Sequence, residues 1–222
     1  MLEALVLDFD GTILDTETPE VDTWRGIFAT HGATFPDEYW INAIGRGADQ
    51  ITESPLELLA RLSTRPIHHI NVRAEYEKLR LQAIHELDCC DGIAELISRI
   101  GSRGIPMGVA SSSRHDWVDP HLARLGMNQF HTVVCADDVE RAKPFPDLYL
   151  EVCRRLRADP QKSVAIEDSP NGIRAAKAAG LLCIAIPNPC TRRLDLSGAD
   201  YQFESAKAIE LEWIDAVIQD RA

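Results

Sequence analysis

Two short segments of the chain place a pair of acidic residues directly after an apolar run. Asp8 and Asp10 follow an apolar run near the N-terminus, and Glu167 and Asp168 follow another apolar run far along the sequence. Residues i and i+2 of an extended segment point to the same side, so Asp8 and Asp10 can face one site. Carboxylates this close raise one another's pKa unless a cation compensates them, and oxygen ligands with a few waters suit Mg²⁺. The pattern therefore predicts a Mg²⁺ site.

A lysine and a run of serines can complete this site. Ser111 opens a serine triplet that follows a third apolar run, and Lys143 stands before a proline ahead of a predicted helix. Taken singly, an aspartate such as Asp168 can cap a helix, and a serine triplet can form a turn. Carboxylates, an ammonium group and hydroxyl groups together are typical of a site that handles phosphoryl groups. One carboxylate would then act as a nucleophile or as an acid and base.

Short apolar runs rich in β-branched residues mark the strands that would position these side chains. The five runs are Ala4–Leu7, Pro106–Ala110, Thr132–Cys135, Ser163–Ile166 and Leu182–Ile186. Helical segments are expected between the later runs, over 119–126, 145–156 and 173–179. Strands that alternate with helices predict an α/β fold, a Rossmann-like parallel sheet with helices on both faces. The carboxyl ends of its strands meet at one edge, where the polar side chains can share a pocket.

The interval between the first two strands differs from the others because it is long and contains only helical signals. Helices are expected over 18–29, 56–62 and 66–87, each opened by a proline at or near its start. The insert leaves the sheet at the carboxyl end of the first strand, where ligands of such sheets bind. We therefore expect residues 1–16 and 88–222 to form the catalytic core, and residues 17–87 to form a helical domain that acts as a lid.

Four segments of the chain match the motifs of a known family in order. Residues 8–17 (DFDGTILDTE), Ser111, Lys143-Pro144 and residues 167–172 (EDSPNG) resemble the four motifs of the haloacid dehalogenase superfamily. The resemblance covers nearly the whole chain. The insert resembles the helical cap of the branch that contains phosphatases and β-phosphoglucomutases.

The resemblance implies a role for each core residue. Asp8 would be the nucleophile and form an aspartyl-phosphate, and Asp10 would protonate the leaving oxygen and then deprotonate the attacking water. Ser111 and Lys143 would bind the oxygens of the phosphoryl group.

The same resemblance implies the ligands of Mg²⁺. The Asp8 carboxylate, the Asp10 backbone carbonyl and Asp168 would hold the ion, with Glu167 as a further ligand or as a partner of one. A dehalogenase does not need the second aspartate, so Asp10 favours phosphate chemistry.

The substrate-binding residues are expected in the lid and in the serine triplet. Trp24 stands where the mutase relatives have a tryptophan that contacts substrate, and Arg46 lies in a lid loop that carries a phosphate-binding arginine in those relatives. Ser112 and Ser113 are expected beside the phosphoryl group. Trp24 could instead belong to the core of the helical domain, and Arg46 could be a solvated loop charge. Glu20 replaces a histidine of the mutases, which favours a phosphatase.

The composition of the chain limits which classes of partner it can bind. The chain has 222 residues, with 23 Lys and Arg against 35 Asp and Glu, a net charge of −12. Such a surface repels nucleic-acid backbones and anionic membranes. No apolar window reaches the ~20 residues of a membrane span, and the N-terminus lacks a signal-peptide pattern. Six cysteines at irregular spacing indicate reduced thiols. We expect a cytoplasmic monomer or weak dimer acting on a small phosphorylated metabolite.

Three functions compete. The first is a Mg²⁺-dependent phosphatase for a small metabolite such as a sugar phosphate. The second is a β-phosphoglucomutase-like enzyme. Whether inorganic phosphate is released from glucose phosphates would distinguish the phosphatase from this mutase. The third is a phospho-receiver signalling module, which also uses an acceptor aspartate, Mg²⁺, a hydroxyl group and a lysine. Receivers place their acidic pair before the acceptor strand and lack a helical insert of this length, so the phosphatase is preferred.

Overall fold

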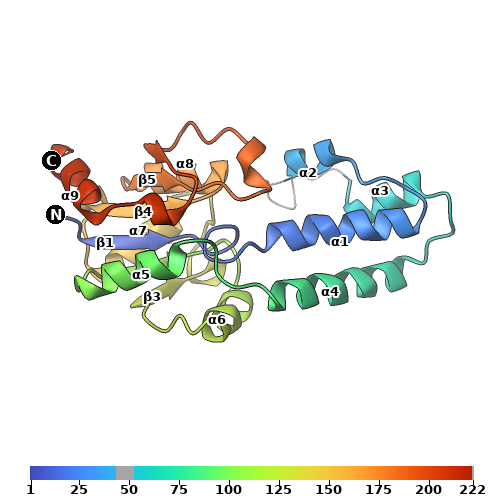
Figure 1. The fold of residues 1–222 in the computed structure, drawn as a ribbon, viewed down its shortest axis with the longest axis horizontal. Coiled ribbons are helices and arrows are strands. Elements are labelled where there is room, and N and C mark those ends of the chain that lie inside the picture. The colour runs from blue at the N-terminus through green and yellow to red at the C-terminus, as the bar shows by residue number, and fades with distance from the viewer. Residues whose placement is uncertain (44–52, 222) are drawn as a thin grey trace.

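The structure, a computed structural model, describes residues 1–43 and 53–221. It consists of two parts that lie end to end, a parallel sheet covered by helices and an all-helical insert (Figure 1). The N- and C-termini lie together at the end of the sheet that is far from the insert. The fold is α/β and Rossmann-like, as the sequence predicts.

Six parallel strands form the sheet in the order β3-β2-β1-β4-β5-β6. Their bounds are β1 Ala4–Leu7, β2 Met107–Ala110, β3 Thr132–Val134, β4 Ser163–Glu167, β5 Leu182–Ala185 and β6 Tyr201–Gln202. The first strand is central, and Leu7 pairs with Val109 on one side and with Ile166 on the other. This register brings Asp8, Ser111 and Glu167 to the same edge of the sheet.

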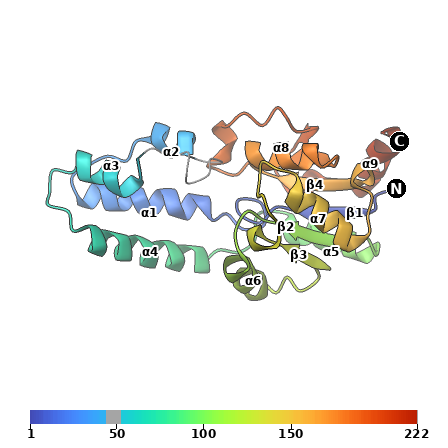
Figure 2. The same ribbon diagram turned by 180° about the vertical axis from the view of Figure 1, so that it is seen from behind.

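Helices cover both faces of the sheet. Their bounds are α5 Ile93–Ser102, α6 His115–Arg124, α7 Asp147–Leu156, α8 Pro170–Ala178 and α9 Leu211–Asp220. Leu5 and Leu7 of β1 face the apolar side chains of α5, α6 and α9, whereas Val6 faces those of α7 and α8. The alternation follows from the two-residue period of a strand buried on both faces. Helix α5 lies in front of the strands in Figure 1, and α7 in the opposite view of Figure 2.

The insert is built from helices that follow β1. They are α1 Glu17–Thr30, α2 Asp37–Ala43, α3 Pro55–Leu62 and α4 His69–His85. Trp24 and Phe28 of α1, Leu59 of α3 and Tyr76 of α4 are buried against one another in a separate apolar core. Ser54 begins α3 with a capping box, in which its hydroxyl group accepts the N–H of Glu57 and the Glu57 carboxylate accepts the N–H of Ser54. The insert therefore has its own packing.

Most of the expected elements are present, and some boundaries differ. All five predicted strands are confirmed, and β6, α2, α5 and α9 are additional. The prediction that a helix begins at Asp119-Pro120 is wrong, because α6 begins at His115 and contains Pro120. An interior proline costs a backbone hydrogen bond. Burial of Val118 and Leu122 in the sheet's core offsets that cost.

The state of the cysteines and the apolar character of the helices were both expectations from the sequence. All six cysteines are free, and burial raises the pKa of the Cys90 thiol to about 12. A protonated thiol is a weak nucleophile. Over residues 1–43 and 53–221, no helix is long and apolar enough to span a membrane.

Candidate active site

A pocket of about 480 Å³ lies beyond the carboxyl ends of the strands. Both parts of the molecule contribute to its wall, the sheet loops on one side and helices α1 and α4 on the other. The residues that line it are Asp8, Asp10, Thr16, Glu17, Glu20, Arg80, Ser112, Ser113, Trp117, Lys143, Asp168, Ser169 and Asn171. Six of the residues that the sequence predicts for the site are therefore in this wall: Asp8, Asp10, Ser112, Ser113, Lys143 and Asp168.

Asp8 and Lys143 form a buried ion pair at the floor of the pocket. Their side chains are 7% and 5% exposed, and the Lys143 ammonium group donates to Asp8 Oδ1. Burial raises the pKa of Asp8 to about 7; the lysine charge opposes this rise, and Glu167 adds to it. Burial acts to lower the pKa of Lys143, but the charges of Asp8 and Glu167 outweigh burial and raise it. Lys143 therefore stays cationic, and its charge only partly offsets the effect of burial on Asp8.

Glu167 orients this lysine from the end of β4. Its Oε1 accepts hydrogen bonds from Lys143 Nζ at 2.7 Å and from the Tyr149 hydroxyl group at 2.6 Å. Its Oε2 accepts the backbone N–H groups of Asp168 and Ser169 at 3.1 and 3.3 Å. A Cβ on Gly172 would lie 1.8 Å from Glu167 Oε1, so glycine leaves the space that the carboxylate fills.

Asp168 completes a buried acidic group. Ligand oxygens of Asp8, Glu167 and Asp168 lie within 4.8 Å of one another. Burial raises the pKa of Asp168 well above its ordinary value, and the nearby carboxylates of Glu17 and Asp8 raise it further. The Asn188 amide donates to Asp168 Oδ2 at 2.7 Å. Three buried carboxylates with one lysine have an excess of negative charge, and their oxygen donors fit a hard divalent cation.

Asp10 lies in the same pocket wall and is surrounded by hydrogen-bond donors. Its Oδ1 accepts the Thr16 hydroxyl group at 2.9 Å and the Trp117 indole N–H at 2.8 Å. Its Oδ2 accepts the Ser113 hydroxyl group at 2.6 Å and lies 3.5 Å from Ser111 Oγ. Asp10 is therefore held by the loop of Ser111, Ser112 and Ser113 (the serine loop) on one side and by α6 on the other.

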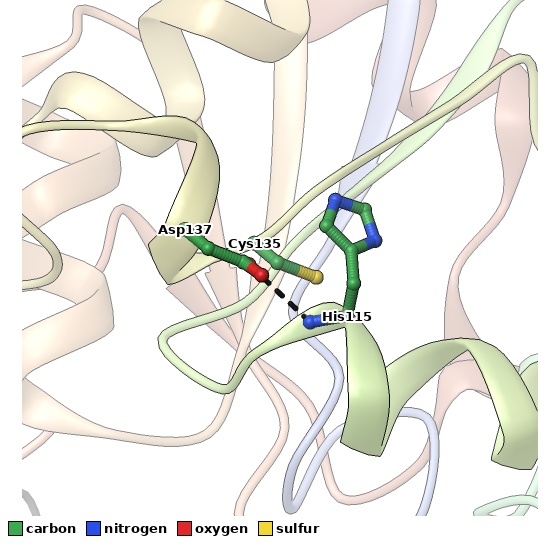
Figure 3. A group of neighbouring side chains, drawn as sticks. All are labelled: His115, Cys135 and Asp137. Carbon is green, nitrogen blue, oxygen red and sulfur yellow. Dashed lines mark hydrogen bonds between the residues drawn. The ribbon is translucent and has the colours of Figure 1, made fainter.

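The serine loop is anchored by a polar group at the start of α6. In Figure 3 the His115 backbone N–H donates to Asp137 Oδ1, at 3.3 Å, with Cys135 beside them. The two nitrogens of the His115 ring contact carboxylates of Asp119 and Asp138 at 3.1 and 2.7 Å. These contacts join the segment after the serines to the turn after β3, and so fix where α6 begins.

The predicted substrate residues have different positions. Ser112 and Ser113 line the pocket, and Ser111 is buried beneath them, where its Oγ accepts the Ser113 N–H at 3.0 Å. Trp24 is 5% exposed and stacks on Tyr76 in the core of the insert, with ring centroids 4.4 Å apart; it is not among the residues of the pocket wall. Arg46 lies outside the described residues.

Three residues in or beside the pocket were not singled out from the sequence. Arg80 comes from the middle of α4, and Trp117 from α6, and neither belongs to a motif. Asn188 follows β5 and contacts Asp168, Glu17 and the Gly11 carbonyl. Helical spacing places a residue on a face but does not show which pocket that face meets. The position of Asn188 after a predicted strand was the one usable signal.

The model of the haloacid dehalogenase-like hydrolase family matches residues 5–186 of the chain. The chain belongs to this family. The matched range contains the whole group of carboxylates, the lysine and the serine loop.

Relatives extend over most of the chain. The Bacillus subtilis (strain 168) protein YhcW is 35% identical over 212 residues, which cover 95% of each chain. Fructose-1-phosphate phosphatase YqaB of Escherichia coli (strain K12) is 32% identical over 178 residues, 80% of this chain and 92% of that one. A crystal structure of CbbY from Rhodobacter sphaeroides in complex with phosphate has a TM-score of 0.70 at 29% identity, over 97% of this chain and 100% of that one. The protein is a hydrolase of phosphoric monoesters in this family.

Proposed function

We propose that the protein is a Mg²⁺-dependent phosphatase that hydrolyses a small phosphorylated metabolite, such as a sugar phosphate, through an aspartyl-phosphate on Asp8. The observation that carries the proposal is the floor of the pocket. There the Asp8 carboxylate is paired with the buried ammonium group of Lys143, and Asp10 lies in the same wall with its own set of donors. A nucleophile, a fixed positive charge and a separate acid and base are what transfer of a phosphoryl group to a carboxylate requires.

Each residue then has one task. Asp8 attacks the phosphorus atom, and Asp10 delivers a proton to the leaving oxygen and later takes one from water. Lys143, held by Glu167, and the hydroxyl group of Ser111 bind the oxygens of the phosphoryl group, where charge develops.

The acidic group would hold the metal. The carboxylates of Asp8 and Asp168 and the backbone carbonyl of Asp10 are the proposed ligands, and Glu167 contributes negative charge beside them. When bound, Mg²⁺ would neutralise the charge of the phosphoryl group and orient it for in-line attack. Glu167 is engaged by Lys143, Tyr149 and two backbone N–H groups, which favours a role as the partner that orients Lys143 over a role as a ligand.

The helical insert is the proposed lid and specificity domain, residues 17–87. Three of its side chains line the pocket: Glu17, which accepts the Asn188 amide, and Glu20 and Arg80. An acid and a cation at that position can bind hydroxyl and anionic groups of a substrate. The activity named for the E. coli relative supports a sugar phosphate as the substrate class.

The test is phosphate release across a panel of phosphorylated metabolites with Mg²⁺, with wild type and Asp8→Asn compared. We expect release from at least one sugar phosphate by the wild type and none by the variant. Conversion of one glucose phosphate into another without release would favour the mutase. Release that persists in Asp8→Asn would refute the nucleophile assignment.

A further inference from the structure

The two oxygens of Asp10 face different kinds of partner. Oδ1 accepts the Trp117 indole N–H at 2.8 Å and the Thr16 hydroxyl group at 2.9 Å. Oδ2 faces the Ser113 hydroxyl group at 2.6 Å, and Ser111 Oγ is 3.5 Å away. A hydroxyl group can donate or accept a hydrogen bond, but an indole N–H can only donate. The two oxygens are therefore not equivalent.

We propose that Trp117 is a positioning residue that fixes the orientation of the Asp10 carboxylate, with Oδ1 toward the indole N–H and Oδ2 toward Ser113. The proposal rests on the proposed function, in which Asp10 is the general acid. The indole N–H and the Thr16 hydroxyl group both donate to Oδ1, so these two bonds hold the carboxylate in one orientation. In this orientation Oδ2 faces Ser111 and Ser113, where the phosphoryl group is expected.

Proton transfer by Asp10 balances both steps of the proposed reaction. In the first step a bond forms between an Asp8 oxygen and phosphorus, the bond from phosphorus to the leaving oxygen breaks, and the Asp10 proton moves to that oxygen. In the second step a water oxygen bonds to phosphorus, the bond to Asp8 breaks, and a proton of the water returns to Asp10. An alcohol and inorganic phosphate leave, and both carboxyl groups regain their starting state.

The indole is held in position from both parts of the molecule. Within the core, its ring meets the His121 ring edge-on, with centroids 4.5 Å apart and planes 68° apart. From the insert, the Arg80 guanidinium carbon lies 5.0 Å above the indole and 5.7 Å from the centroid of the Tyr76 ring. Arg80 also donates to Glu77 at 3.1 Å. A ring packed in this way cannot rotate freely, so its N–H keeps one direction toward Asp10.

The test is the dependence of kcat/KM on the leaving group in Trp117→Phe, which removes the N–H and keeps an aromatic ring. A nitrophenolate departs without a proton, whereas an alkoxide needs one. With Mg²⁺ present, we expect a small decrease of kcat/KM for p-nitrophenyl phosphate. For glycerol phosphate we expect kcat/KM to fall by roughly a further ten-fold or more, because a hydrogen bond to a charged group is lost. The matched control is Trp213→Phe, whose indole packs on Tyr201 and Phe203 instead. It should leave the ratio of the two substrates at the wild-type value.

The outcomes separate this proposal from the proposed function. Equal losses on both substrates, or no loss, would show that Trp117 contributes packing only and would overturn the inference. A wild-type protein that releases phosphate from neither substrate nor the metabolite panel would overturn the proposed function instead. Trp117→Leu provides a second variant without a donor, so that the ratio can be measured even if Trp117→Phe does not fold, as circular dichroism would show.

Discussion

At Gly172, helix propensity and the packing of the active site predict opposite effects of an alanine substitution on the free energy of unfolding. The residue lies in the first turn of α8, where replacing glycine by alanine favours a helix by up to about 1 kcal/mol. A Cβ at this position, however, would lie 1.8 Å from Glu167 Oε1. The Glu167 side chain is fully buried and cannot move away without weakening its bonds to Lys143 and Tyr149. Hydrogen bonds to a charged group are worth about 1.5–3 kcal/mol each, so we expect Gly172→Ala to destabilise the protein by roughly 2–4 kcal/mol.

Urea denaturation followed by circular dichroism measures this effect. The control is Gly26→Ala in α1, where an added Cβ meets nothing within 4 Å, and which should raise the free energy of unfolding by about 0.5–1 kcal/mol. Gly172→Ala should also lower phosphatase activity, because Glu167 orients Lys143. If Gly172→Ala is as stable as wild type or more stable, Glu167 is not held as described and the reasoning fails.

Three further predictions concern the metal, the insert and pH. Activity should be lost in EDTA and return with Mg²⁺ but not with Ca²⁺, which prefers more ligands at longer distances; full activity in EDTA would remove the metal from the proposal. Trp24→Ala should lower the free energy of unfolding by roughly 3–5 kcal/mol, measured in urea, because the buried ring stacks on Tyr76; an unchanged stability would contradict its place in the core. Burial opposes ionisation of Asp138, but the Cys135 N–H and the Arg155 guanidinium outweigh it and lower its pKa to about 2 from 3.8. Its contribution to stability is therefore present above pH 3.8 and is lost as the pH falls toward 2. Acid unfolding of Asp138→Asn should consequently depend less on pH in that window, and an unchanged dependence would contradict the assignment.

The strands and the core of the site could be predicted because both depend on local sequence. Runs such as Ala4–Leu7 are apolar on both faces, which identifies buried parallel strands, and the polar residues that follow them must meet at one edge. Asp8, Lys143 and Asp168 are accordingly found together, although they are far apart in sequence.

The pocket wall formed by the helices could not be predicted in the same way. Trp24 and Tyr76 follow the helical period but stack on each other, whereas Arg80, one turn after Tyr76, reaches the pocket. Which of these side chains meets the sheet depends on how the insert is placed against the core, and helical periodicity does not contain that information. Trp117 was missed for a related reason, because Asp119-Pro120 suggested a helix start downstream of it.

The most direct test of the central claim is to trap the phosphoryl group on the protein. Asp10→Ala, which lacks the base for the second step, is mixed with p-nitrophenyl phosphate and Mg²⁺, quenched in acid and digested for mass spectrometry. The expected result is one equivalent of p-nitrophenol and a phosphoryl group, removable by hydroxylamine, on the peptide that contains Asp8. Release of p-nitrophenol with no modified peptide, or with the phosphoryl group on another residue, would contradict the account.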